Sequence, residues 1–177
     1  MTEQAIIKQI GKPSEIDFRK PKAIGSAGFY LKSFKAKNPE SENLKLDSKC
    51  NFEKRTNGIL LRANYSNKLT AIPIPKESII GITITRGKET IDPFFLSPMW
   101  ILLKLGISKL YARYFKILIS EYSIDQMELN LKTAEYEMDF IANGYLFERQ
   151  QSFFENLNYE NKLKIIIKAS TCTQHCL

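Results

Sequence analysis

The chain has 177 residues, 44% of them hydrophobic and 25% charged, which suits one domain with a substantial core. Its formal charge of +7 favours acidic partners such as phospholipid headgroups or nucleic acid only if the cations gather on one face. The three cysteines exclude the regular, even-numbered framework of a secreted disulfide protein, so we expect a reducing, cytoplasmic environment.

The first part of the chain, residues 1–54, is polar and poorly patterned, which predicts an N-terminal extension that is partly irregular. Residues 1–12 include an acid and several polar residues where a signal peptide needs a continuous apolar run, so we expect no export. Residues 37–49 have the composition of a loop. We therefore expect a β domain over residues 55–170.

Short β-branched runs separated by turn residues follow, and they predict antiparallel sheet. Residues 58–64 and 68–74 flank a short connection of the length and residue types of a hairpin. Residues 78–87 predict a third strand with one buried and one polar face. Three alternating residues would share the buried face: Ile80, Ile82 and Ile84.

The most distinctive segment is residues 92–120, which contains the only tryptophan, Trp100, and four cations. Its longest apolar run, residues 93–103, ends at Lys104 and is too short for a membrane-spanning helix of about 18 residues. Residues 90–112 are therefore predicted to be an apolar insertion in the β domain. The candidate residues for contact with a membrane or a partner are Phe94, Phe95, Trp100 and Leu103.

A helical projection from Leu105 onward separates an apolar face from a basic one. The apolar face holds Ile107, Leu110, Tyr111, Tyr114 and Leu118. The candidate basic face holds Lys109, Arg113 and Lys116, with Lys104 preceding them. Such a helix suits the surface of an anionic bilayer. A surface helix packed on a sheet, with solvated lysines, has the same composition, and residues 114–119 could instead begin a strand.

The apolar insertion has three alternative explanations: burial in the chain's own core, burial in a homodimer, and shallow insertion into a bilayer. Large exposed apolar patches are rare in monomeric proteins, so a partnerless exposed loop is not among them. Because apolar runs are usually core, burial in the chain's own core is the first expectation.

A second hairpin is predicted by residues 127–132 and 136–140, where apolar side chains alternate with polar ones. Residues 145–157 place Phe147, Phe154 and Leu157 at helical spacing around Gln150, which predicts an amphipathic helix of about three turns.

The end of the chain predicts one more strand and a tail. Residues 161–170 alternate Leu and Ile with lysines, a pattern that suits the edge of a sheet. Residues 171–177 are predicted to be a disordered tail. His175 lies there between Cys172 and Cys176, but a structural zinc site needs four ligands, so no metal site is expected.

Two sequence segments resemble the pleckstrin-homology-like superfold, in particular its bacterial and GRAM-type members. They are NGILLRANYSNKLTAIPIPKESIIGITI, which looks like the first two strands and the entry to the third, and EYEMDFIANGYLFERQQSFFENL, which looks like the closing strand and helix. The resemblance covers about residues 57–157. It implies a mostly β (α+β) fold, a bent antiparallel β-sandwich or partly open barrel capped by a C-terminal amphipathic helix.

Members of this superfold mostly bind phosphoinositides, peptides, small proteins or other domains. The phosphoinositide-binding members carry clustered Lys and Arg across the first hairpin, where this chain offers only Arg62 and Lys68. The tryptophan that is frequent in the family's helix is absent, and Trp100 lies in the insertion instead. The resemblance therefore favours a binding module without indicating its ligand.

No catalytic residues and no cofactor are predicted, because the sole histidine lies in the tail and no nucleophile has a recognisable partner. We expect a non-enzymatic binding or regulatory module, cytoplasmic and peripheral at the membrane, whose segment 94–116 engages anionic lipid headgroups or a protein partner. One alternative is single-stranded nucleic-acid binding by a basic, aromatic face such as residues 29–37. The other is a structural domain whose apolar insertion is only core or a dimer interface.

Overall fold

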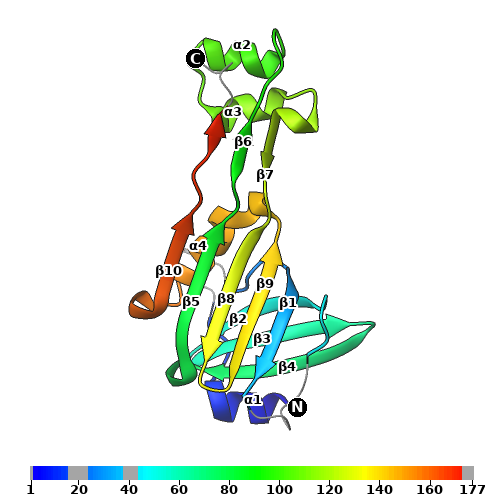
Figure 1. Ribbon diagram of the computed structural model, residues 1–177. Coiled ribbons are helices and arrows are strands. Elements are labelled where there is room, and N and C mark those ends of the chain that lie inside the picture. Colours follow the sequence, from blue (N-terminus) through cyan, green and yellow to red (C-terminus); the bar gives the residue numbers. More distant parts are fainter. Residues whose placement is uncertain (1, 16–23, 38–43, 173–177) are drawn as a thin grey trace.

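The computed structural model describes residues 2–15, 24–37 and 44–172 (Figure 1). The strands are β1 (Phe29–Ala36), β2 (Lys49–Arg55), β3 (Gly58–Tyr65), β4 (Lys68–Pro75), β5 (Ile79–Arg86), β6 (Glu89–Ile91), β7 (Tyr122–Ile124), β8 (Met127–Thr133), β9 (Tyr136–Ala142), β10 (Leu163–Ile167) and β11 (Thr171–Cys172). The α-helices are α1 (Glu3–Ile10), α2 (Pro98–Lys104), α3 (Lys109–Ala112) and α4 (Phe147–Glu155). Short 3-10 helices are η1 (Lys76–Ser78), η2 (Arg113–Phe115), η3 (Ile119–Glu121), η4 (Gly144–Leu146) and η5 (Glu160–Lys162).

Eight strands form one sheet in the order β10-β5-β8-β9-β1-β2-β3-β4. Neighbouring strands are antiparallel, except that β10 runs parallel to β5. The sheet bends, so that β2, β3 and β4 run across the direction of β5, β8 and β9, and α4 packs behind it (Figure 1). The protein is thus mostly β, with a bent sheet that does not close and a C-terminal helix, as the sequence predicts.

Four buried phenylalanine rings form the centre of the core between the sheet and α4. Phe29, Phe52 and Phe140 come from β1, β2 and β9, and Phe154 comes from α4. Their ring centroids lie 5.2 to 6.3 Å apart in edge-to-face contact, a geometry that adds about 0.5–1.5 kcal/mol per pair beyond the buried area. These rings attach the helix to strands that are far apart in the sequence.

Both predicted hairpins are confirmed. β3 and β4 are joined by Ser66 and Asn67, both with positive φ, as a tight two-residue hairpin turn requires. β8 and β9 meet at a turn where the hydroxyl of Thr133 accepts the backbone N–H of Tyr136 at 2.8 Å. The predicted amphipathic helix is also confirmed, with Phe147 and Gln150 on its buried side.

The predicted buried face of β5 is wrong at one position. Ile82 and Ile84 are buried, but Ile80 is 54% exposed and Ile79 is buried in its place. The cause is a β-bulge, because the pairing of β5 with β8 shifts register between Ile79 and Gly81. An extra residue in one strand reverses the face of every residue on its far side.

The predicted N-terminal extension, residues 1–54, is not separate from the β domain. Within it, β1 pairs with β9 and β2 pairs with β3 in the main sheet, so a domain boundary at residue 55 is wrong. Helix α1 packs Ile6 and Ile10 against Leu60 of β3. The buried Arg55 guanidinium binds Glu3 of this helix at 2.7 Å and Glu53 at 2.8 Å.

The end of the chain is partly as predicted. β10 is an edge strand of the main sheet with Lys164 and Lys168 exposed, which confirms that prediction. The predicted tail 171–177 is wrong for Thr171 and Cys172, because β11 pairs with β6 in a second, three-stranded sheet. His175 and Cys176 lie outside the described residues.

Gln150 offers a test of this core. Its side chain is fully buried in α4, and both polar atoms of its amide lack a hydrogen-bond partner among the described residues. We expect Gln150→Met, which keeps the length of the side chain, to raise the free energy of unfolding by about 1–3 kcal/mol, because the desolvation cost disappears. Urea denaturation measures it, and a loss of stability would show that the amide has a bound partner.

Candidate functional site: the distal apolar surface

A small subdomain stands at the end of the molecule farthest from α1 (Figure 1). It consists of residues 89–124 together with β11, and we call it the distal module. Its sheet has the order β11-β6-β7, and these short strands lie just beyond β10, β5 and β8 of the main sheet. The predicted apolar insertion, residues 90–112, is therefore part of a folded unit that is longer than predicted.

Helix α2 is built from local signals. Its N-cap, Ser97, accepts the backbone N–H of Trp100 at 3.0 Å, and Pro98 occupies the first turn. The helix ends before Gly106, whose φ of 78° is the left-handed conformation that favours glycine. It buries Met99 completely.

The core of the distal module is small. Its buried members are Ile91, Met99, Ala112 and Tyr122, with Leu102, Leu103 and Ile124 partly buried against them. A core of this size covers only part of an apolar segment. Most of the other large apolar side chains between residues 94 and 119 therefore face solvent.

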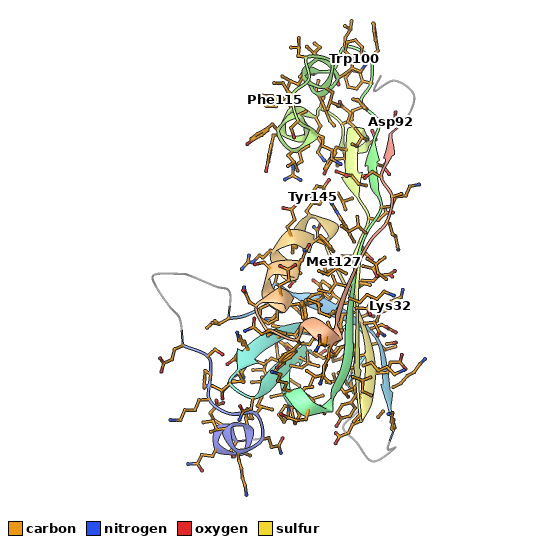
Figure 2. The ribbon with its side chains drawn as sticks, turned by 90° about the vertical axis from the view of Figure 1, so that its left-hand side faces the viewer. Lys32, Asp92, Trp100, Phe115, Met127 and Tyr145 are labelled. Atoms are coloured by element: carbon orange, nitrogen blue, oxygen red, sulfur yellow. The ribbon has the colours of Figure 1, made fainter. Side chains whose placement is uncertain are left out.

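These exposed side chains form what we call the distal apolar surface. Residues 94–119 carry thirteen of the twenty-one exposed large apolar side chains of the described residues. They are Phe94, Phe95, Leu96, Ile101, Leu105, Ile107, Leu110, Tyr111, Tyr114, Phe115, Ile117, Leu118 and Ile119. Exposure reaches 74% at Tyr114 and 83% at Ile119. Figure 2 shows side chains projecting outward around this end of the molecule, with Phe115 and Trp100 labelled.

The predicted helix from Leu105 onward is wrong. Helix α3 has only four residues, a single 3-10 turn follows it, and Lys116 is extended with ψ of 138°. As a result, the two sides are not those of a surface helix that packs its apolar face on a sheet. Predicted apolar-face residues such as Tyr111 and Tyr114 are exposed, whereas the predicted basic residues after Leu105 are each partly buried against the small sheet.

Glu89 explains why Lys109 lies against the small sheet. Its buried carboxylate accepts hydrogen bonds from the Nζ of Lys109 at 2.5 Å, the hydroxyl of Tyr122 at 2.7 Å and the hydroxyl of Ser170 at 2.9 Å. Burial alone would raise the pKa of Glu89, but these hydrogen bonds outweigh burial and lower the pKa below its usual value. Lys109 is thereby committed to an internal ion pair.

Glu121 holds the backbone of two exposed residues of the surface. Its carboxylate accepts the backbone N–H groups of Ile117 at 2.8 Å and Leu118 at 2.9 Å. Burial would raise the pKa of Glu121, but hydrogen bonds from Ser97, Leu118 and Ile117 lower it. The backbone that exposes Ile117 and Leu118 is therefore held by two hydrogen bonds.

The other predicted site residues divide into two groups. Phe94 and Phe95 are exposed, as a contact surface requires, and Leu103 is partly buried on the small core. Trp100 is partly buried. Its ring centroid lies 5.0 Å from that of Phe95 and 5.7 Å from the ammonium of Lys104. Arg113 and Lys116 flank the ring of Tyr122, with charged atoms 5.8 and 6.0 Å from its centroid.

The candidate contact residues lie in the first half of the surface. In the second half, the predicted apolar face names five exposed residues but misses Phe115, Ile117 and Ile119. One further signal in the sequence marks the whole segment. Residues 93–120 contain four cations and no Asp or Glu, and the nearest acids are Asp92 and Glu121 at the two ends. An exposed surface helix of ordinary composition mixes both signs of charge, so this bias indicates a special environment.

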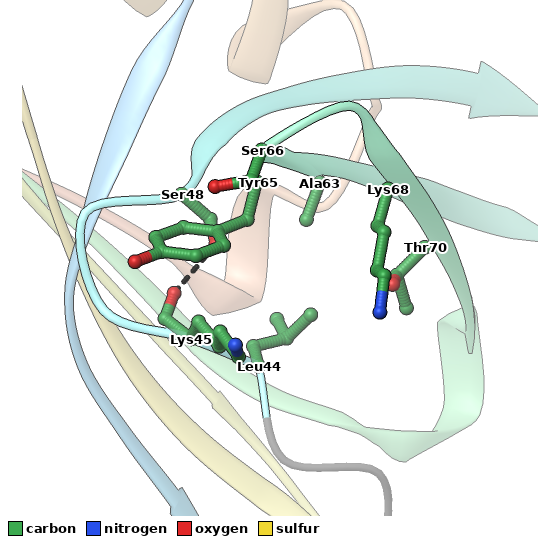
Figure 3. A pocket seen from close by; sticks show the side chains of 8 residues that line it. All are labelled: Leu44, Lys45, Ser48, Ala63, Tyr65, Ser66, Lys68 and Thr70. Atoms are coloured by element: carbon green, nitrogen blue, oxygen red, sulfur yellow. Dashed lines mark hydrogen bonds between the residues drawn. The ribbon is translucent and has the colours of Figure 1, made fainter.

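A cavity of about 290 Å³ lies elsewhere, between the segment before β2 and the β3–β4 hairpin (Figure 3). Lys45, Lys68 and several hydroxyl groups line it, with the Nζ of Lys45 4.9 Å from the ring centroid of Tyr65. Its lining contains no carboxylate. The cavity is therefore suited to an acidic or polar ligand, but it is far from the distal module (Figure 1).

Other kinds of site have less support. The buried thiol of Cys50 has its pKa raised to about 12 by burial, so it is a poor nucleophile. Within the described ranges, no group of three or more His, Cys, Asp or Glu residues could hold a metal ion. Over the same residues, every helix is too short or too polar to cross a bilayer.

Comparison with known proteins found no matching protein-family model, curated protein or solved structure.

The two buried carboxylates predict a pH dependence. A carboxylate with a lowered pKa contributes stability above its unfolded pKa, near 4.5 for Glu, and loses it as the pH falls through the lower folded value. We expect the distal module to open below about pH 4.5, reported by fluorescence of Trp100, the only tryptophan.

Glu89→Gln should remove the part of the pH dependence that comes from Glu89. It should also lower the stability of the distal module at neutral pH by about 1.5–3 kcal/mol, the worth of a hydrogen bond to a charged group. The matched control is Glu128→Gln on the exposed side of β8, which should change nothing. If the Trp100 fluorescence of Glu89→Gln follows the same pH curve as that of the wild type, the carboxylate does not hold the module.

Proposed function

We propose that this protein is a non-enzymatic binding module that attaches peripherally to a lipid bilayer through the distal apolar surface. The observation that carries the proposal is the concentration of thirteen exposed large apolar side chains within residues 94–119, at one end of the molecule. The main β domain then stands away from the bilayer and offers its own surface to other ligands.

Hydrophobic energy supports attachment. Burying apolar surface contributes about 25 cal/mol per Å², or roughly 1.5–3 kcal/mol for a large side chain that becomes fully buried. Insertion of residues such as Tyr114, Phe115 and Ile117 therefore contributes to offsetting the loss of freedom on binding. Aromatic residues also suit the interface between water and hydrocarbon, because their rings are apolar and tyrosine keeps a polar tip.

Pre-organisation supports it further. Glu121 fixes the backbone at Ile117 and Leu118 by two hydrogen bonds, and Glu89 fixes α3 through Lys109. The surface is thus presented without a folding step, which would reduce the affinity.

Charge favours a bilayer over a second copy of this chain. Two distal surfaces meeting face to face would bring Arg113 and Lys116 of both copies together, and among the described residues the ion pairs within 4.0 Å include neither cation. Anionic headgroups supply the missing negative charge. An acidic protein partner is the remaining occupant, and failure of the wild type to bind vesicles in the test below would favour it.

The nucleic-acid alternative has less support from the aromatic residues in its segment. Phe29 is fully buried in the main core, and Phe34 packs against Tyr136 with ring centroids 5.5 Å apart. Tyr30, which is 50% exposed, is the remaining ring of that segment available for stacking on bases.

The pleckstrin-homology-like resemblance remains part of the proposal. If it holds, it must begin at β1 and not at residue 57, because β1 and β2 belong to the same sheet. The distal module would then be an insertion between two strands of that fold, β5 and β8. A cytoplasmic location is proposed with it.

The proposal predicts that apolar substitutions at the tip abolish vesicle binding. We expect Tyr114→Ser, Phe115→Ser and Ile117→Ser together to weaken co-sedimentation with phosphatidylcholine–phosphatidylglycerol vesicles by about 100-fold or more, from roughly 1 kcal/mol of lost burial per side chain. The matched control replaces exposed apolar residues of the main sheet, Leu69, Ile80 and Ile167, by serine and should bind normally.

Three results would contradict lipid attachment. The wild type could fail to bind vesicles at low salt, where charge attraction is strongest. The tip variant could bind as well as the wild type. The wild type could also be a dimer by analytical ultracentrifugation, made monomeric by the tip substitutions, in which case the occupant is a second copy.

A further inference from the structure

We propose that Arg113 and Lys116 form a binding site for the phosphate of anionic phospholipids at the margin of the distal apolar surface. This inference rests on the proposed attachment to a bilayer and names the lipid class that the surface selects.

The two cations are held in place by the same tyrosine. Both charged groups lie within about 6 Å of the Tyr122 ring centroid, at 5.8 Å for Arg113 and 6.0 Å for Lys116. The Nζ of Lys116 donates to the carbonyl oxygen of Tyr122 at 2.9 Å and lies 3.4 Å from the hydroxyl of Tyr145. An Nη of Arg113 donates to the hydroxyl of Tyr114 at 3.3 Å. These contacts already order both side chains, so ligand binding does not have to order them.

Neither cation is in a direct ion pair with an acid of the described ranges. Among the described residues, the ion pairs within 4.0 Å include neither Arg113 nor Lys116, in contrast to Lys109, which pairs with Glu89. Lys116 acts on the pKa of Glu121 through its charge, but one oxygen of that carboxylate already accepts two backbone N–H groups. A guanidinium has five N–H donors and an ammonium three, so both groups keep donors for a phosphate.

The neighbours in sequence place these charges at the right depth. Arg113 precedes the exposed Tyr114, and Lys116 lies between the exposed Phe115 and Ile117. When these apolar side chains enter the acyl boundary, the adjacent cations reach the level of the phosphates, where long basic side chains extend naturally. The hydroxyl of Tyr145, from η4 of the main domain, adds a polar group beside Lys116. The apolar neighbours are what select a lipid over a free phosphate.

The test compares Arg113→Gln/Lys116→Gln with the wild type on phosphatidylcholine vesicles with and without phosphatidylglycerol. A cation near an anionic surface contributes about fivefold in affinity, so we expect the double variant to lose about 25-fold on the anionic vesicles and almost nothing on pure phosphatidylcholine. Each single variant should lose about fivefold, which keeps the test informative if the double variant does not fold. Arg113→Lys/Lys116→Arg, which keeps both charges, should retain most binding.

A matched control is Lys132→Gln/Lys164→Gln, which removes the same charge from exposed positions of the main sheet. If this control weakens binding as much as Arg113→Gln/Lys116→Gln, overall charge and not a site accounts for the effect, and the proposal is overturned. Wild-type binding that is equal on both vesicle types, and unchanged in the double variant, also overturns it but leaves attachment to the bilayer standing. No binding to either vesicle type would overturn both proposals. Displacement by soluble glycerol phosphate at a matching concentration would assign the site to free phosphate.

Discussion

The distal module depends on one buried charge, the carboxylate of Glu89. An isolated charge in a protein interior costs several kcal/mol, and that cost is offset only when hydrogen bonds satisfy the charged oxygens. Glu89 receives its donors from three separate places: Lys109 in α3, Tyr122 in β7 and Ser170 just before β11. A single side chain of β6 therefore holds both neighbouring strands and one helix. An apolar core with four buried members would hold them less specifically.

This anchor determines which residues face outward. In an ordinary amphipathic helix the apolar stripe packs inward and the charges remain in water. Here the internal groups that need partners are carboxylates, so Lys109 turns inward, and Glu121 holds the chain extended where the helix would have continued. Tyr111, Tyr114 and Phe115 are left on the outside. The exposed apolar surface and the internal ion pair are thus two consequences of the same arrangement.

The sequence predicted the parts of the fold that depend on neighbouring residues. The two hairpins, α4 and the edge strand β10 all have local periodicity and turn signals, and each is present. β1 and β2 were assigned to an extension because their pattern is weak and β1 pairs with β9, more than a hundred residues later. No local pattern reports such a distant partner. Ile80 was misplaced because a β-bulge leaves no signature in the alternation of residues.

The candidate site was predictable in composition but not in geometry. The apolar segment was found, and Phe94 and Phe95 are exposed as a contact would need. The basic face was not, because Lys109 pairs with an acid twenty residues earlier, across the small sheet. A helical projection assumes that each side chain's environment follows from its angle around the helix axis. A long-range ion pair makes that assumption invalid. The absence of carboxylates from residues 93–120 was the more reliable signal, since it does not depend on the local conformation.

The junction between the two sheets bears on how attachment would act on the rest of the molecule. A Cβ atom at Gly87 would lie 2.1 Å from the backbone oxygen of Asp125, and one at Gly144 would lie 2.0 Å from the same atom. The N–H of Asp125 in turn donates to the carbonyl of Lys88 at 2.9 Å. Backbone packed this closely leaves little room for a hinge, so the distal module and the main sheet should move together. A bilayer bound at the tip would then fix the orientation of the main domain and keep the cavity of Figure 3 in water, open to a second ligand.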